Sequence, residues 1–262
     1  MSNNGTVLDN LVAAMASGGV KVVDLTETLT ESYPVIALPP QFGQAEPFKK
    51  EEISRYDDRG VAWYWNNFTL SEHTGTHFDA PCHWVTGKDV KKGSVDTIDP
   101  GHFVAPVCVI DCSKEVAANQ DFILTKDVIQ AWEKEHGDIP AGSWVFLRSD
   151  WRSIVSDDNI TNNDADGNPH HPGPDAEAVQ YMIDRDVIGF GTECVGTDHG
   201  QSFTWDPPLP CHALMHGAGK YGLQCMTNLD KLPAKGAVVI SPPLKIEDGS
   251  GSPLRVLAMV PA

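Results

Sequence analysis

The sequence has no apolar run that approaches the roughly 20 residues needed for a membrane-spanning helix. It also lacks an excess of basic residues, because the formal net charge is -17 and the acidic residues are spread along the chain. An acidic surface repels phosphate groups, which argues against nucleic acid and anionic membranes as partners. We therefore expect a globular protein that binds no nucleic acid and no membrane.

Motifs of several common enzyme classes are also missing. No GxSxG elbow occurs, which argues against a serine hydrolase of that kind, and no phosphate-binding glycine loop is present. The six cysteines form no CxxC pair, and a chain of 262 residues needs no disulfide bonds to stabilise its core. The N-terminal apolar patch follows Asp9 and no basic residue, so we expect an amphipathic helix there instead of a signal peptide. These features predict reduced cysteines and a cytoplasmic location.

Short apolar runs alternate with a few helical patterns along the chain. The predicted strands are rich in β-branched residues and bounded by Gly, Pro or Asp; they cover Val20–Leu25, Val104–Asp111, Ser143–Arg148, Val187–Gly191, Ala237–Ser241 and Arg255–Val260. Helical spacing predicts helices over Thr125–His136, Pro174–Arg185 and His212–Gly219, with a polar loop over 157–174. No repeat divides the chain, so we expect one mixed α/β domain spanning residues 1–262.

One stretch, Ser71–Trp84 or SEHTGTHFDAPCHW, gathers three histidines and one aspartate within eleven positions. His73 and His77 have the i, i+4 spacing seen on metalloprotease helices. A helix is disfavoured here, because residues 74–76 are weak helix formers and Pro81 would break it.

An extended chain explains the spacing better, because residues of equal parity share one face of a strand. The four polar side chains all have odd numbers: His73, His77, Asp79 and His83. An extended segment that bends at its end would bring them together. Two neutral imidazoles and a carboxylate are a common ligand set for a catalytic divalent ion, and both Mn²⁺ and Zn²⁺ fit such a set.

The same stretch resembles a known signature. HTGTHFDAPCH is similar to the HxGTHxDxPxH motif of the metal-dependent cyclase family, which includes kynurenine formamidases and isatin hydrolases. Weaker similarities follow in the family's order at Val23–Thr26, Trp144–Trp151, Val195–Asp198 and Asn228–Pro233. The resemblance implies a swivelling β/β/α fold, in which helices flank a central, twisted, β-barrel-like sheet. It also implies a homodimer or larger homo-oligomer that hydrolyses an amide-type bond.

The resemblance assigns roles to individual residues. It implies that His73, His77 and Asp79 bind the metal ion and that His83 is catalytic. Formamidases carry a further histidine followed twelve residues later by a glutamate that helps to hold a second metal. This chain instead has His212 followed by Gln224.

The exchange of glutamate for glutamine affects the number of ions. A neutral amide cannot balance the charge of a second dication, so we expect one ion per chain, with the Gln224 oxygen as an additional ligand. This pattern is similar to the isatin hydrolase branch of the family, which implies Mn²⁺, with Zn²⁺ as the alternative.

The expected reaction opens the lactam ring of isatin to isatinate. His83 would take the proton of an activated water, and His212 would hydrogen-bond nearby or relay protons. A flat aromatic amide requires a mostly apolar, aromatic slot. The candidates for that slot are aromatic side chains on either side of the motif: Trp63, Trp65, Phe68 and Trp84.

Two other functions stay open from sequence alone. The first is an arylformamidase that hydrolyses N-formylkynurenine, which two tightly bound metals per chain would favour. The second is a metal-binding protein without catalytic activity. His83 distinguishes a non-catalytic metal-binding protein from an enzyme, because a site that only binds the ion needs no free histidine beside it.

Overall fold

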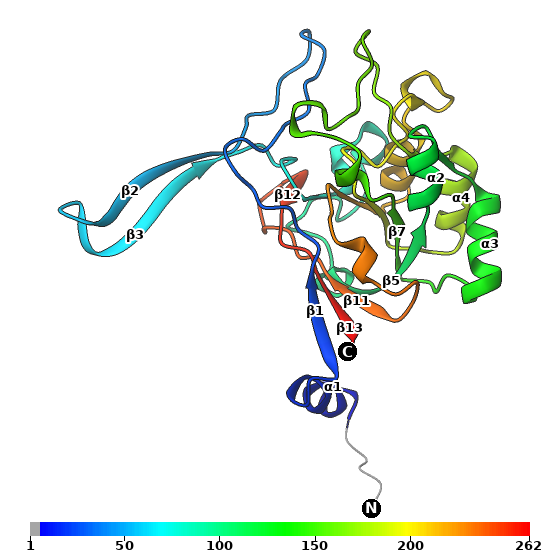
Figure 1. The fold of residues 1–262 in the computed structure, drawn as a ribbon, viewed down its shortest axis with the longest axis horizontal. Coiled ribbons are helices and arrows are strands. Elements are labelled where there is room, and N and C mark those ends of the chain that lie inside the picture. Colours follow the sequence, from blue (N-terminus) through cyan, green and yellow to red (C-terminus); the bar gives the residue numbers. More distant parts are fainter. Residues whose placement is uncertain (1–5) are drawn as a thin grey trace, which may run out of the picture.

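The computed structural model describes residues 6–262, and its centre is a nine-stranded sheet that curls into a half-barrel (Figure 1). The strand order is β1-β13-β11-β5-β7-β9-β10-β4-β12. The central strands β5, β7, β9 and β10 are parallel, whereas the strands on both sides of them run antiparallel. The bounds are β1 Val20–Asp24, β4 His77–Asp79, β5 Val104–Asp111, β7 Trp144–Arg148, β9 Gly189–Thr192, β10 Tyr221–Gln224, β11 Ala237–Ile240, β12 Gly251–Pro253 and β13 Leu257–Pro261.

Residues 6–262 form four α-helices beside the sheet: α1 Val7–Ala16, α2 Ser113–Ala118, α3 Lys126–His136 and α4 Ala176–Asp184. The N-terminal ends of α3 and α4 are capped by side chains that accept a backbone N–H, Thr125 from Val128 and Asp175 from Ala178. The helix α3 ends at Gly137, which has a φ of 81° that favours glycine. Figure 1 shows α2, α3 and α4 together on one side of the sheet.

The sheet separates two hydrophobic cores. The side chains of β7 point alternately into one core and the other. Trp144 and Phe146 pack into the core inside the curl, together with Phe78 and Leu223. Their neighbours Val145 and Leu147 point to the opposite face and pack into the core beneath α2, α3 and α4. Because β7 is buried on both faces, it reads as a continuous apolar run in the sequence.

Two further strands form a hairpin separate from the large sheet. The strands β2 (Lys49–Asp57) and β3 (Gly60–Thr69) pair only with each other. Figure 1 shows that this hairpin projects away from the rest of the chain. We call it the arm. A third, short sheet joins β6 (Ile123–Leu124) to β8 (Gly173–Pro174).

The fold expected from the sequence is confirmed. The structure is a mixed α/β fold with a barrel-like central sheet and flanking helices. All six predicted strands occur, β5 with the predicted bounds and the other five with shifted ends. The predicted N-terminal helix corresponds to α1 within the described range. Residues 1–5 lie outside that range. The predicted helix His212–Gly219 is instead a π-helical turn, η7, over His212–His216.

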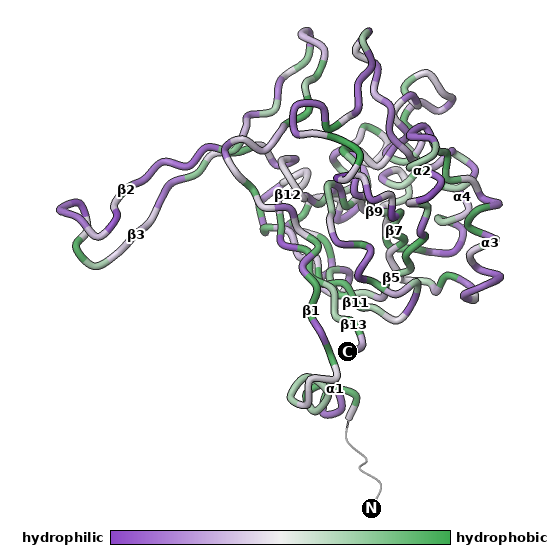
Figure 2. The backbone as a smooth tube through the Cα atoms, in the orientation of Figure 1, coloured by the Kyte–Doolittle hydropathy of each residue, from purple (hydrophilic) through white to green (hydrophobic). Residues whose placement is uncertain are grey.

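The arm and the short strands β10 and β12 were not anticipated. Figure 2 shows that β2 is hydrophilic along most of its length. A search for apolar runs therefore does not detect this strand. Residues 6–262 contain no helix long and apolar enough to cross a membrane. The six cysteines are all unpaired.

A partly buried ion pair joins α3 to the C-terminal end of α4. Arg185 contacts both carboxylate oxygens of Glu133, at 2.5 and 2.8 Å, and the Tyr181 hydroxyl donates to the same group at 2.6 Å. The Ile139 amide adds a fourth hydrogen bond at 2.9 Å. Burial by itself would raise the pKa of Glu133, but these donors outweigh it and hold the pKa below its usual value.

Replacing Glu133 by Gln should destabilise the chain, because it leaves Arg185 without its charged partner. We expect a loss of about 1–3 kcal/mol in the free energy of unfolding at pH 7, measured by denaturant titration. A carboxyl group with a lowered pKa stabilises the fold above its unfolded pKa and loses this effect in acid. The difference between wild type and E133Q should therefore shrink as the pH falls below about 4.5. The control is E135Q on the same helix, where the side chain is exposed.

Candidate metal centre

The histidine motif Ser71–Trp84 folds around a strand of only three residues. The extended backbone is confined to β4, His77–Asp79, and does not run through the whole motif as expected. Before β4, Gly75 adopts a φ of 66°, a turn that favours glycine. After β4, Pro81 begins a 3₁₀ turn, η1, that ends at His83. The polar side chains therefore converge because a turn precedes β4 and another follows it. Their shared odd numbering along an extended chain does not by itself bring them together.

Asp79 lies at the centre of the cluster and is completely buried. Its Oδ1 is 2.8 Å from His73 Nδ1 and 3.4 Å from His77 Nε2. Burial alone would raise the pKa of Asp79, but the neighbouring imidazoles, His77 above all, hold it well below its usual range. Asp79 is therefore a carboxylate.

The hydrogen bonds of the two imidazoles fix which nitrogen is free. The Nδ1–H of His77 donates to the Gly75 carbonyl at 2.7 Å, which leaves a lone pair on Nε2. The Ser250 hydroxyl donates to Glu72 at 2.6 Å, so its oxygen accepts from Nε2–H of His73 at 2.9 Å. When this ring is a metal ligand, its free lone pair is then on Nδ1.

In the neutral tautomers that bind a metal ion, both free lone pairs would face the same carboxylate oxygen of Asp79. A cation or a shared proton among these three electron-rich atoms removes their mutual repulsion. Partners that orient the outer nitrogen of a histidine are also typical of metal-binding sites. His73, His77 and Asp79 thus fit a divalent ion, and His73, Asp79 and His83 also have ligand atoms within 4.8 Å of one another.

Two glycines make room for this centre. Asp79 pairs with Gly222 on β10 and with Gly251 on β12, so glycine lies opposite it on both neighbouring strands. A Cβ atom at Gly222 would be 2.8 Å from Asp79 Oδ2, and one at Gly251 would be 2.5 Å from the His73 ring. No larger residue fits at either position without moving the ligands.

His83 lies beside the ligand set. Its ring stacks at 31° on His73, with 3.9 Å between ring centroids, and makes no hydrogen bond to a residue within 6–262. Burial lowers the pKa of His83 to about 3, against the opposing effect of Asp79. The imidazole is therefore neutral, and it can accept a proton.

His212 is held from behind by an aspartate. Asp198 Oδ2 accepts from His212 Nδ1, and Oδ1 accepts from the Cys211 amide. The Nε2 of His212 then faces Asp79 Oδ2 at 3.9 Å. Burial would lower the pKa of His212, but Asp198 outweighs it and the pKa is raised. His216, one turn along η7, donates Nδ1–H to the Lys220 carbonyl and is also buried.

Gln224 lies in the centre, but with the opposite orientation to the one expected. Its oxygen accepts from the Gly196 amide at 2.7 Å, which fixes the positions of the amide oxygen and nitrogen. Its nitrogen donates to Asp79 Oδ2 and lies 3.4 Å from His212 Nε2. In this orientation Gln224 is a donor to Asp79, and its oxygen is turned away from the expected ion.

The predicted aromatic residues divide into two groups. Trp84 lies in the centre, with its ring centroid 4.8 Å from His212 and 6.0 Å from His83. Trp63, Trp65 and Phe68 instead lie on β3 in the arm and are exposed. The structure therefore does not bring these three rings to the metal centre of their own chain.

Several supporting residues carried no signal in the sequence. Gly222 lies on β10, Gly251 on β12 and Ser250 directly before β12, all far along the chain from His73. Asp198 appeared in the sequence only within the similarity over Val195–Asp198. Their roles arise because the sheet places β4 between β10 and β12.

Comparison with known proteins fits this geometry. The family model named Cyclase matches residues 23–199. The chain belongs to the cyclase family. An isatin hydrolase from Roseibium aggregatum is 49% identical over 257 residues, which make up 98% of each chain.

Solved structures of the cyclase family agree with the whole chain. Isatin hydrolase A from Labrenzia aggregata, bound to benzyl benzoate, has a TM-score of 0.95 and 58% identity over 98% of this chain and 100% of that chain. An isatin hydrolase bound to the product analogue thioisatinate has a TM-score of 0.95 and 48% identity over 100% of both chains. The resemblance inferred from the sequence motif is confirmed.

Replacing Asp79 by Asn should abolish tight metal binding, because it removes the one charged ligand and retains its volume. Loss of an outer partner alone typically costs 10–100-fold in affinity, so we expect a fall of more than ~100-fold. Metal content after dialysis, measured by mass spectrometry, tests this. D127N on the exposed face of α3 is the control. Retention of a full metal complement by D79N would contradict the assignment.

Proposed function

We propose that this chain hydrolyses the lactam ring of isatin to give isatinate. One observation carries the proposal: the metal centre occurs in a chain that is similar, end to end, to isatin hydrolases, including one bound to a product analogue. Water adds across the amide C–N bond, so the carbonyl carbon becomes a carboxylate and the ring nitrogen becomes an amine. The chain is then an enzyme that acts on a cyclic amide.

We propose one divalent ion per chain, Mn²⁺ with Zn²⁺ as the alternative, held by His73, His77 and Asp79. Such an ion supplies Lewis acidity, which polarises a carbonyl oxygen and lowers the pKa of a nearby water. The orientation of Gln224 supports a single ion. Its amide nitrogen lies between Asp79 Oδ2 and His212 Nε2, where a second cation would need electron-rich atoms.

The histidines beside the ligands move the protons in this proposal. Neutral His83, whose ring makes no hydrogen bond to a residue within 6–262, accepts the proton of the attacking water and returns it to the departing nitrogen. His212, oriented by Asp198, presents Nε2 to the other side of Asp79 and stabilises the developing charge or relays protons outward. Trp84 provides one wall for the flat aromatic substrate.

The remaining features are also proposals. We assign one domain to residues 1–262, a cytoplasmic location consistent with six unpaired cysteines, and a homodimer as the assembled state. Trp63, Trp65 and Phe68 keep their proposed role in substrate binding.

The first experiment measures metal content per chain, without added metal during purification, together with the loss of isatin and of N-formylkynurenine. One manganese per chain with isatin turnover supports the proposal. Two metals with turnover of N-formylkynurenine would show that the chain is an arylformamidase and that Gln224 does not prevent a second ion. Metal binding without turnover of either compound would favour a binding protein.

His83→Ala should retain its metal ion and lose activity. General acid–base catalysis contributes ~10²–10⁴-fold, and kcat for isatin should fall by that factor. H136A on α3, outside the centre, is the matched control and should keep wild-type activity. If H83A retained turnover, His83 would not be the base.

Asp198→Asn should lower kcat without loss of the metal ion. The asparagine amide would donate towards His212 Nδ1 and favour the wrong tautomer, with Nε2 protonated. We expect a fall on the order of 10–100-fold in kcat and little change in KM. The exposed loop variant D166N is the control. A change in KM alone would instead indicate a role in substrate binding.

A further inference from the structure

The two imidazoles that would bind the ion, those of His73 and His77, have different partners on their other ring nitrogen. The Nδ1–H of His77 donates to a neutral acceptor, the Gly75 carbonyl. Nε2 of His73 lies 2.9 Å from the Ser250 hydroxyl, and that hydroxyl donates to the Glu72 carboxylate at 2.6 Å. Two hydrogen bonds thus connect the His73 ring to a negative charge, and we call this chain of Glu72, Ser250 and His73 the relay.

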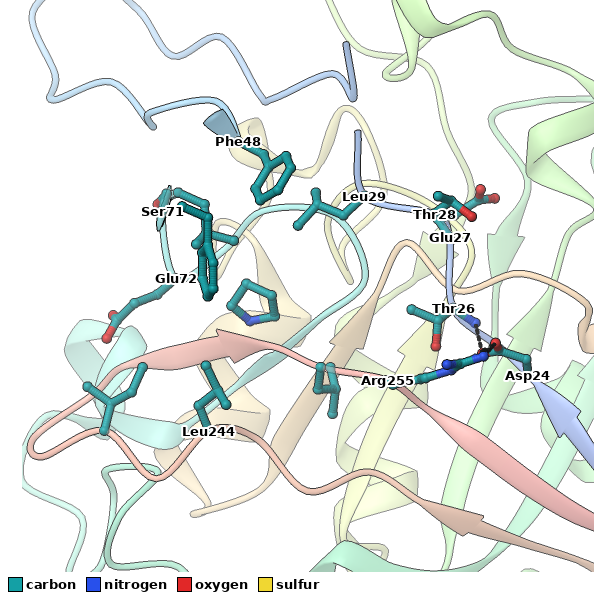
Figure 3. Close-up of a pocket in the computed structure, with 15 residues that line it drawn as sticks. Asp24, Thr26, Glu27, Thr28, Leu29, Phe48, Ser71, Glu72, Leu244 and Arg255 are labelled. Carbon is teal, nitrogen blue, oxygen red and sulfur yellow. Dashed lines mark hydrogen bonds and ion pairs between the residues drawn. The ribbon is translucent and has the colours of Figure 1, made fainter. Parts of the chain in front are cut away.

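Glu72 contacts Ser250 through two hydrogen bonds. Its Oε2 accepts from the Ser250 amide at 3.2 Å as well as from the hydroxyl. Within residues 6–262 Glu72 forms no ion pair, so no basic side chain of the described chain neutralises it directly. Figure 3 shows its carboxylate at the edge of an apolar groove, directed away from Leu29 and Phe48. The carboxylate therefore has Ser250 as its partner and not the groove.

The backbone around Ser250 allows both ends of the relay to come close. A Cβ atom at Gly249 would be 3.2 Å from Glu72 Oε1, and one at Gly251 would be 2.5 Å from the His73 ring. Glycine on each side of the serine therefore leaves room for the carboxylate and the imidazole. The Ser250 carbonyl also accepts from an amide just after β4 at 2.9 Å, which fixes the segment beside the metal centre.

The relay also affects the charge balance of the centre. A divalent ion brings two positive charges, and imidazoles are neutral when they bind a metal. The ligand set of His73, His77 and Asp79 therefore brings one negative charge. A charge that is removed from water without compensation is costly. Glu72 supplies a second negative charge on the side of His73, connected through Ser250.

We propose that Glu72 and Ser250 are positioning residues that fix the orientation and tautomer of His73 and thereby strengthen its bond to the metal ion. When Nε2–H donates to the Ser250 oxygen, the lone pair for the metal lies on Nδ1, the atom that faces Asp79. The Glu72 charge polarises the Ser250 hydroxyl and, through it, the His73 ring, which makes Nδ1 a stronger ligand. The inference rests on the ion of the proposed function and goes beyond it, because it identifies what controls one of the ligands.

Ser250→Ala removes the middle of the relay and should weaken metal binding. It leaves Nε2–H of His73 without this acceptor and frees the ring to turn. Loss of such an outer partner typically costs 10–100-fold, and we expect the dissociation constant for Mn²⁺ to rise by that factor. The constant is measured on metal-stripped protein by titrating Mn²⁺ against a competing chelator. S113A removes another serine hydroxyl that donates to a carboxylate, outside the centre, and should bind Mn²⁺ as wild type does.

Glu72→Gln keeps the size of the side chain and removes its charge. We expect the dissociation constant for Mn²⁺ to rise about 10-fold, because the hydroxyl of Ser250 is no longer polarised by a carboxylate. The matched control is E247Q, which removes one exposed negative charge from the segment before Ser250 and should change the constant little. The comparison separates the relay from a general loss of negative charge.

Two further measurements separate positioning from structural damage. S250T retains a hydroxyl and should bind Mn²⁺ more tightly than S250A does. The Tm of the metal-free chain should be similar in S250A and wild type, whereas the increase in Tm caused by a fixed concentration of Mn²⁺ should be smaller in S250A. Equal affinities of wild type, S250A and E72Q would overturn the proposal, and so would a loss in S250T as large as that in S250A.

These measurements need no substrate, so they separate the relay from the proposed reaction. A chain that binds one Mn²⁺, binds it more weakly in S250A and does not open isatin would keep the relay and reject the proposed reaction. A wild-type chain that binds no divalent ion would overturn the relay together with the ion on which it rests.

Discussion

The metal centre depends on one buried negative charge, that of Asp79. A carboxylate in a fully buried position is costly unless its charge is compensated. The ring nitrogens of His73 and His77 face one of its oxygens, and the Gln224 amide donates to the other. Each oxygen therefore has its own partners: Oδ1 faces the two imidazoles that would hold the proposed ion, and Oδ2 accepts from Gln224.

The curled sheet makes this arrangement possible. β4 is only three residues long, yet it is inserted between β10 and β12, which supply Gly222 and Gly251 on both sides of Asp79. The parallel strands beside it are buried on both faces, and α3 and α4, joined by the Glu133–Arg185 pair, support one of these faces. The centre thus lies on a rigid part of the fold, whereas the aromatic rings expected to bind substrate extend from it on the arm.

The contrast between centre and arm suggests how the chain divides its tasks. Charged and polar groups that handle the ion and protons are built within one chain and are buried. The largest exposed aromatic side chains lie on a hairpin that the described part of the chain does not cover.

The sequence by itself determined the strands that are continuous apolar runs, the helices α3 and α4, and the clustering of histidines with Asp79 within one motif, because each of these signals is local. It could not determine how the ligands converge, since Gly75 and η1 bend a chain that parity alone would extend. It also misjudged the orientation of Gln224, which depends on the Gly196 amide, and the location of Trp63 and Trp65. Only the tertiary structure decided these points, because contacts between residues far apart in the chain fix them.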